Sequence, residues 1–355
     1  LTIIQPILSG IADYVGRKKL FFKIFMYLGS ASCISLYFFD GSNIEFGIIC
    51  SVLASLGFSG SLVFYNAFLP EIVSRDKFDR VSARGYSFGY IGSVILLIIC
   101  LVLITFYDFF GFSNSALATR FTFLLVGIWW IVFSQITFIT VPEVIKNQKI
   151  SFSILSYGIN ELIKVWNYLK NVRNLKLFLF SFFFYSMGVQ TVMLIASYFG
   201  SKELNLDQNK LILTILIIQI VAIFGAYFFA YISKIKGNKF SLIIMNILWI
   251  IICISAYFIQ DENQFYLLAT TVGLVMGGIQ SLSRSTFSKL IPIEIEDNAS
   301  FFNFYAISYN MSIVLGTFSY GYIEQITGSM RISTLVLASY FLIGLVILLF
   351  VKIKK

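Results

Sequence analysis

The stretch Ser9-Gly-Ile-Ala-Asp13-Tyr-Val-Gly16-Arg17-Lys18-Lys19 decides how the rest of this 355-residue chain is interpreted. It is a short, charged, glycine-containing segment between two apolar runs. Charges are scarce elsewhere, because 12% of the residues are charged and 58% are hydrophobic. Soluble domains contain about 25% charged residues. A charged turn in such a chain is expected to connect two membrane-spanning helices.

The composition places the chain among helical membrane proteins. Its mean hydropathy is +0.87, which no soluble protein of this size could bury. The apolar runs are long and continuous, whereas a transmembrane β-barrel shows alternating segments of about 10 residues. We therefore predict an all-α polytopic membrane protein with the lipid bilayer as a partner.

Several function classes are excluded at this stage. The net charge of +9 is spread over loops and forms no basic domain, so no nucleic-acid partner is expected. The chain has no histidine, and its four cysteines lie inside apolar runs without metal-ligand spacing. We expect no cofactor, no metal and no catalytic site, because the spans contain no nucleophile constellation or carboxylate pair. The protein is predicted not to be an enzyme.

Ten apolar runs are long enough to cross a membrane as helices of about 20 residues. They lie at 21–39, 45–67, 82–107, 117–140, 177–199, 210–232, 239–259, 264–288, 300–323 and 332–351. An eleventh piece, residues 1–9, is too short to cross and is interpreted as the end of a further helix.

The basic residues predict the orientation of these spans. Of the 26 Lys and Arg residues, 22 lie at loops on one side of the predicted membrane and four on the other. The four are Arg120, Lys202, Lys210 and Arg331. Because cytoplasmic loops are rich in Lys and Arg, the first side is predicted to be cytoplasmic, together with the C-terminus. We expect a multi-pass protein of the inner (plasma) membrane.

The chain divides into three predicted parts: an N-terminal helical bundle (1–140), a cytoplasmic linker with an amphipathic helix (141–176) and a C-terminal bundle (177–355). The amphipathic face of the linker consists of Phe152, Leu155, Ile159, Leu162, Ile163, Trp166 and Leu169. We expect this helix to lie on the membrane surface or on the cytoplasmic helix ends. A regulatory target segment is the alternative.

An internal repeat relates the two bundles. Asp13-Tyr-Val-Gly16-Arg17-Lys18 recurs as Lys234-Ile-Lys-Gly237-Asn238-Lys239, again between two spans. Such parallel repeats occur in transporters built from two homologous halves. The second half has six predicted helices and the first has five visible pieces. We therefore expect one helix and most of a second to be missing before Leu1.

The motifs resemble a known family. The SGIADYVGRKK turn is similar to the signature loop between helices two and three of the major facilitator superfamily. Several further motifs resemble its vacuole effluxer-like branch, which includes autophagy-related amino-acid exporters of fungal vacuoles and bacterial relatives. These motifs are FYNAFLPEI (64–72), VSARGYSFGYIGS (81–93), YSMGVQT (185–191), GNK (237–239), GGIQSLSRSTFSKLIP (277–292) and SFFNFY (300–305).

The resemblance implies two pseudo-symmetric six-helix bundles and efflux of amino acids, in a bacterial-type member lacking its N-terminal helix. It also implies an acidic residue directly before Gly188, where this sequence has Met187.

Polar side chains within the spans are candidate ligands for a small polar solute. They are Gln190, Thr191, Gln280, Arg284, Asn66, Gln219 and Asn310. The resemblance implies that their helices line a central cavity, and Arg284 could hold a carboxylate by two parallel bonds. The alternative for the amides is hydrogen bonding between helices. For Arg284 it is extension of the side chain to lipid phosphate.

The cytoplasmic turns supply candidate gating residues, namely Asp13, Arg17, Lys18, Arg80 and Arg84. A carboxylate stabilises a helix N-terminus, and the span 300–323 begins near Asn298-Ala299-Ser300. We predict that Asp13 binds this helix start when the protein is closed to the cytoplasm, with Arg17, Arg80 or Arg84 as its ion-pair partner. For the basic residues the alternative is a role in topology alone.

These observations predict a membrane transporter for a small polar solute that works by alternating access as a monomer of two bundles. A membrane scaffold or receptor that does not transport is the alternative on the same fold. It predicts a sealed cavity in which Gln190, Gln280 and Arg284 pair among themselves.

Overall fold

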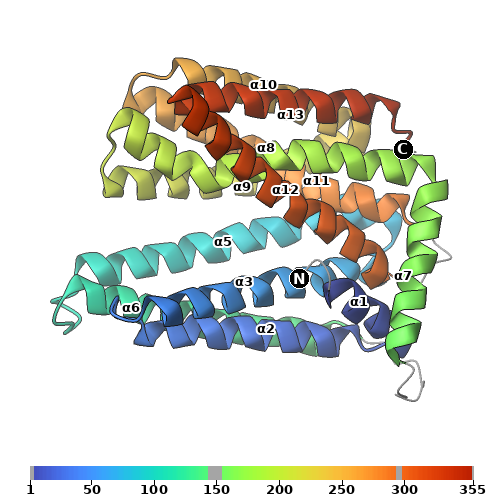
Figure 1. The fold of residues 1–355 in the computed structure, drawn as a ribbon, viewed down its shortest axis with the longest axis horizontal. Coiled ribbons are helices and arrows are strands. Elements are labelled where there is room, and N and C mark those ends of the chain that lie inside the picture. The colour runs from blue at the N-terminus through green and yellow to red at the C-terminus, as the bar shows by residue number, and fades with distance from the viewer. Residues whose placement is uncertain (1–3, 143–153, 293–297, 354–355) are drawn as a thin grey trace. The chain divides into compact units, whose positions relative to one another are not determined.

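The computed structural model describes residues 4–142, 154–292 and 298–353, and every regular element in these ranges is a helix. The helices are shown in Figure 1. They are α1 (Ile4–Val15), α2 (Lys18–Ser35), η1 (Leu36–Phe38), α3 (Ile44–Ala67), α4 (Leu69–Ile72), η2 (Arg75–Lys77), α5 (Phe78–Thr105), α6 (Ser115–Thr140), α7 (Ile154–Asn171), α8 (Arg173–Leu204), α9 (Gln208–Lys236), α10 (Asn238–Phe258), α11 (Glu262–Leu290), α12 (Asn298–Thr327) and α13 (Met330–Phe350).

All ten predicted spans are helical, and nine of the described helices are long and apolar enough to cross a membrane. The exception is α12, which has 30 residues but less apolar character. Its polar side chains include Asn303, Tyr309, Asn310 and Ser312. A span with this many polar groups is stable in a membrane only when they face protein or a water-filled space.

The described chain forms two compact units. Unit 1 contains residues 1–72, 95–166 and 293–306, and unit 2 contains 73–94, 167–292 and 307–355. Three helices, α5, α7 and α12, therefore contribute to both units, and α7 is divided after Trp166. The first part of α5 belongs to unit 2 and its remainder to unit 1, whereas α12 begins in unit 1 and continues in unit 2.

Unit 1 is built around α2, which packs against α3 and α6 (Figure 1). Glycines allow these helices to approach closely. A Cβ added at Gly57 would lie 2.4 Å from the Cα of Gly29, and one added at Gly29 would lie 2.3 Å from the ring of Trp130. This close backbone approach is typical of small residues at helix interfaces in membranes.

In unit 2, helices α9 and α11 pack closely against each other. A Cβ added at Gly225 would lie 2.0 Å from the carbonyl oxygen of Leu274, and one at Gly277 would lie 2.1 Å from that of Ala222. On the other side of this unit, the rings of Trp249 and Phe341 stack at 5.2 Å between α10 and α13. Among the nine described helices that are long and apolar enough to cross a membrane, α8 and α11 are the most enclosed by protein.

The turn at Ser9–Lys19 is shorter than the sequence indicates. Helix α1 continues through Ser9 and Asp13 to Val15, so the connection consists only of Gly16 and Arg17. The expected helix end at residue 9 is wrong, because the apolar criterion misses a helix whose last turns carry small and charged residues. Gly16 has a φ of 73° and the equivalent Gly237 a φ of 88°, so both repeat copies use glycine in a backbone region that other residues rarely adopt.

The predicted linker helix is present as α7. Ile159, Ile163 and Trp166 are about half exposed, at 44%, 50% and 48% respectively. The ring of Trp166 stacks on Phe304 at 5.9 Å. An exposed apolar stripe agrees with a helix lying against a membrane surface, which stays a prediction. Phe152 lies outside the described residues.

Three of the four basic residues on the predicted non-cytoplasmic side form ion pairs. They are Lys202 with Glu324 (2.6 Å), Lys210 with Glu262 (2.5 Å) and Arg331 with Glu203 (2.9 Å). The fourth, Arg120, donates a hydrogen bond to the carbonyl oxygen of Tyr37 at 2.7 Å.

Candidate functional site

The Asp13 side chain caps the start of α12. It is buried, with 1% exposure, at the end of α1. One carboxylate oxygen accepts a hydrogen bond from the backbone N–H of Ser300 at 2.7 Å, and the other accepts from that of Ala299 at 3.3 Å. These N–H groups lie in the first turn of a helix and have no acceptor within that helix. The structure therefore contains the predicted contact, whereas its role in gating stays a prediction.

A lysine neutralises this carboxylate. Lys18 is the first residue of α2, and its Nζ lies 3.1 Å from Asp13 and 2.5 Å from Glu71. The Nδ2 of Asn298 donates to the same Glu71 oxygen at 3.4 Å. We refer to Asp13, Lys18, Glu71 and the start of α12 as the first latch. All of its members lie in unit 1.

The arginines proposed as partners of Asp13 lie elsewhere. Arg17 is exposed in the turn before α2, and Arg80 and Arg84 are exposed on α5. The side chains of these three arginines form no hydrogen bond or ion pair with another residue in the described ranges. Within unit 1, Lys18 rather than Arg17 pairs with Asp13, because the helical geometry of α1 and the short turn direct residue 18 inward. Pairing of Asp13 with Arg80 or Arg84, which belong to unit 2, stays a prediction.

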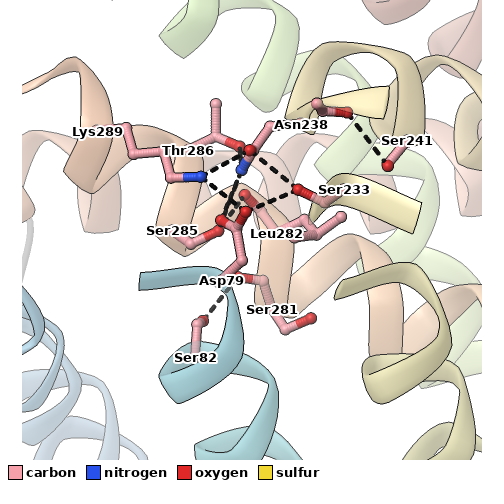
Figure 2. Close-up of polar contacts among 11 residues, drawn as sticks. Asp79, Ser82, Ser233, Asn238, Ser241, Ser281, Leu282, Ser285, Thr286 and Lys289 are labelled. Atoms are coloured by element: carbon pink, nitrogen blue, oxygen red, sulfur yellow. Dashed lines mark hydrogen bonds and ion pairs between the residues drawn. The ribbon is translucent and has the colours of Figure 1, made fainter. Parts of the chain in front are cut away.

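A second polar cluster surrounds Asp79 at the start of α5 (Figure 2). The Asp79 carboxylate accepts hydrogen bonds from Ser233 Oγ (2.7 Å), Asn238 Nδ2 (2.8 Å) and Lys289 Nζ (2.7 Å). Lys289 also donates to Asn238 Oδ1 at 2.8 Å. We refer to Asp79, Ser233, Asn238, Thr286 and Lys289 as the second latch, since Asn238 Nδ2 also lies 3.0 Å from Thr286 Oγ1.

The two latches share one design although their sequences differ. Each joins a carboxylate and a lysine at a repeated glycine turn, beside Gly16 in unit 1 and beside Gly237 in unit 2. In unit 1 the acid precedes the turn. In unit 2 the turn has Lys234 at that position, and the acid comes from α5 instead. The sequence analysis missed Asp79 because nothing in the local pattern links it to a turn about 155 residues later.

Arg284 is buried, with 3% exposure, against the first part of α5. Its Nε donates to Ser82 Oγ at 2.9 Å and its Nη2 to the Ser82 carbonyl oxygen at 3.0 Å. The guanidinium lies 4.8 Å from the ring centre of Tyr86, a cation–π contact. These contacts position Arg284 between α11 and α5, and binding of a solute carboxylate stays a prediction.

Two of the candidate glutamines are bonded to tyrosines. Gln280 Oε1 accepts from the hydroxyl of Tyr90 at 2.8 Å, and Gln190 Oε1 accepts from that of Tyr309 at 3.0 Å. Gln280 is partly exposed, whereas Gln190 is buried. The Tyr86 and Tyr90 rings lie 6.4 Å apart. Unit 2 thus brings Gln190, Gln280 and Arg284 onto a group of tyrosines that can exchange hydrogen bonds with a polar molecule.

The remaining candidates are more dispersed. Thr191 is fully buried, and a Cβ added at Gly316 of α12 would lie 2.4 Å from its Oγ1, so Thr191 lies at a tight helix contact. Gln219 on α9 and Asn310 on α12 are partly exposed, and Asn66 on α3 is buried in unit 1. Six of the seven predicted residues therefore belong to unit 2 and Asn66 belongs to unit 1, and their role as ligands stays a prediction.

Comparison with known proteins agrees with this architecture. All of residues 1–355 match the model of the family described as vacuole effluxer Atg22 like. An uncharacterised MFS-type transporter of Bacillus subtilis, YxiO, is 32% identical over 99% of this chain and 81% of its own length. Autophagy-related protein 22-1 of Emericella nidulans is 28% identical over 71% of this chain, and the matched region is about half (46%) of that relative.

Solved structures show the same fold. The fucose:proton symporter FucP of E. coli superposes with a TM-score of 0.71 over 99% of this chain and 88% of its own, at 13% identity. Nine helices in the described part of the chain are long and apolar enough to cross a membrane. The family match, the relatives and the fold all agree with this architecture. The chain belongs to the Atg22-like vacuole effluxer family and is a multi-pass membrane transporter of the major facilitator type.

Proposed function

We propose that this protein moves a small polar solute across the membrane by alternating access, and that the two latches hold its cytoplasmic side closed. The observation that supports this proposal most directly is the Asp13 carboxylate on the two N–H groups at the start of α12. A cap of this kind stabilises a helix start by about 1 kcal/mol. This free energy is large enough to favour the state closed to the cytoplasm over the open state. It is also small enough for the contact to break during each transport cycle.

The proposed solute is an amino acid, and the proposed direction is efflux. The group formed by Gln190, Gln280 and the tyrosines offers hydrogen bonds of both kinds, as an amino acid requires. Arg284 is proposed to favour a carboxylate nearby. Four further residues are secondary candidates because they place polar side chains within the predicted spans. They are Asn66, Thr191, Gln219 and Asn310.

The proposed setting is the plasma membrane, in agreement with the bacterial relative. We propose two bundles (1–140 and 177–355) joined by the segment 141–176, with that segment and the C-terminus in the cytoplasm. The protein is proposed to act as a monomer.

Transport itself is tested in proteoliposomes that contain the full-length protein and one labelled amino acid at a time. We expect exchange or efflux of at least one amino acid above that of protein-free liposomes. A transporter of another solute class, or a receptor without transport, would show no flux for the whole panel. Exchange assays with sugars and organic anions then separate those two results.

The first latch is tested with Asp13→Asn, which keeps the shape of the side chain and removes its charge. A cysteine at Ser300, in a background without the four native cysteines, reports exposure of the α12 start to an impermeant maleimide. We expect labelling to increase roughly fivefold, because asparagine lacks the negative charge that favours a helix N-terminus and pairs with Lys18, an effect of about 1 kcal/mol. Asp40→Asn, in an exposed loop, is the control and should change nothing. Equal labelling and equal transport in Asp13→Asn and the unmodified protein would refute the latch.

A further inference from the structure

A large cavity in unit 2 lies beside the second latch and is strongly basic. Its volume is about 960 Å³. Its walls come from η2 and the start of α5, the starts of α8 and α10, the ends of α9 and α11, and the residues after α13. Six cations line it, namely Arg75, Lys77, Arg80, Lys234, Lys289 and Lys352, against the carboxylates of Asp76 and Asp79.

Most of this charge is not neutralised by protein. Lys289 is paired with Asp79, and Arg75 donates a hydrogen bond to the carbonyl oxygen of Ile291. The side chains of Lys77, Arg80, Lys234 and Lys352 are exposed and form no ion pair with another residue in the described ranges. Cations gathered around a cavity repel one another, and an anion bound there would relieve this repulsion.

Two helix N-termini add to the positive potential of the same cavity. Val172 and Gly237, the residues before α8 and α10, both line it, and neither provides a side-chain acceptor for the first N–H groups of its helix. Uncapped helix starts favour phosphate and other anions through their free N–H groups and the helix dipole. Here they act together with cations from other helices.

The cavity also borders an exposed surface of α9. Tyr227 and Tyr231 line it and are 44% and 64% exposed. Both belong to a helix long and apolar enough to cross a membrane. Tyrosines in this position are typical of the membrane–water interface, where their rings lie at the level of lipid headgroups.

We propose that this cavity binds the phosphate-bearing headgroup of an anionic phospholipid from the adjoining leaflet. Basic pockets between transmembrane helices are suited to such headgroups. Asp79, Ser233, Asn238 and Lys289 line the cavity as well as forming the second latch. This proposal is independent of the solute and of the first latch.

The test compares two double variants that remove equal charge. Arg80→Gln with Lys234→Gln removes two cavity cations, whereas Arg84→Gln with Lys236→Gln removes two exposed cations from the same two helices that do not line the cavity. The full-length proteins are placed in nanodiscs of phosphatidylcholine with a minor fraction of phosphatidylglycerol. Retained phosphatidylglycerol is counted by native mass spectrometry after release from the discs.

We expect the cavity variant to bind phosphatidylglycerol about 25-fold more weakly, from roughly fivefold for each basic residue near a charged membrane. The matched variant should retain it as the unmodified protein does. Equal retention by all three proteins, or equal loss in both variants, overturns the proposal. A lipid-free sample titrated with inorganic phosphate shows whether the cavity binds a soluble anion rather than a lipid headgroup. Phosphate that binds through Arg80 and Lys234 while phosphatidylglycerol does not would assign the cavity to a soluble anion and also overturn it.

Discussion

The Asp79 carboxylate at the start of α5 joins side chains from three other helices. It receives three hydrogen bonds, from Ser233, Asn238 and Lys289, at 2.7–2.8 Å. The carboxylate and the ammonium are both mostly buried, with 11% and 22% of their side chains exposed. At such a site the loss of one partner is more costly than the loss of both, because it leaves a buried charge without a counter-charge.

We therefore expect Asp79→Asn to lower the free energy of unfolding by about 1–3 kcal/mol, the usual value for hydrogen bonds to charged groups. Lys289→Met alone should have a similar effect. The double variant should lose less than the two single variants together. Unfolding in mixed detergent micelles measures all three. Strictly additive losses would show that the two residues do not act as a pair, and Lys236→Met, an exposed residue of α9, provides the control.

At the scale of single residues, some contacts could be predicted from the sequence and others could not. The contact between Asp13 and the start of α12 was predictable, since a buried acid near a helix start follows from the helix dipole. Its partner Lys18 was not predicted in place of the arginines, because choosing among neighbouring cations requires the direction in which the turn points each side chain. The same holds for Gln190 and Gln280, whose tyrosine partners lie on other helices.

The helices themselves were largely predictable from apolar length. All ten spans appear within a few residues of their expected bounds, because about 20 apolar residues are needed to cross a bilayer. The end of α1 was not predictable by this criterion, and neither was the pairing of α9 with α11. Pairing depends on which faces carry glycines and which backbones approach, and a single sequence does not contain that information directly.

The α9–α11 contact gives a prediction at the scale of the helices. Gly277→Ala places a methyl group about 2.1 Å from the Ala222 carbonyl oxygen, so the helices must separate. We expect a loss of about 1–3 kcal/mol, as for other overpacked sites. Thermal unfolding in detergent measures it. Gly89→Ala on α5 is the matched control, because no described atom lies within 4 Å of an added Cβ there. Alanine favours a helix over glycine, so this control should be neutral or slightly more stable. Equal behaviour of the two variants would contradict the tight contact.

At the scale of the whole molecule, the distribution of charge predicts how the chain lies in the membrane. Ion pairs with glutamate satisfy Lys202, Lys210 and Arg331 on one side. Of the 26 basic residues, 22 belong to the predicted cytoplasmic side. Cytoplasmic loops carry an excess of Lys and Arg, and neighbouring Asp and Glu residues contribute little to this bias, so the 22 basic residues predict which side is cytoplasmic.

Reporter fusions to the full-length protein test this orientation. We expect a fluorescent protein after Lys355 to fluoresce and alkaline phosphatase at the same place to be inactive. Alkaline phosphatase inserted after Leu206, between α8 and α9, should be active. The reverse pattern at both positions would invert the proposed topology, and with it the assignment of both latches to the cytoplasm.

The division of α5 and α12 between the two units has a mechanical consequence. Each is one continuous helix whose first part belongs to one unit and whose remainder belongs to the other. Any relative motion of the units must therefore exchange the contacts of residues 78–94 and 298–306 or bend these two helices. Substitutions in those two segments that leave Asp79, Ala299 and Ser300 unchanged should therefore alter the rate of the conformational cycle more than the populations of its states.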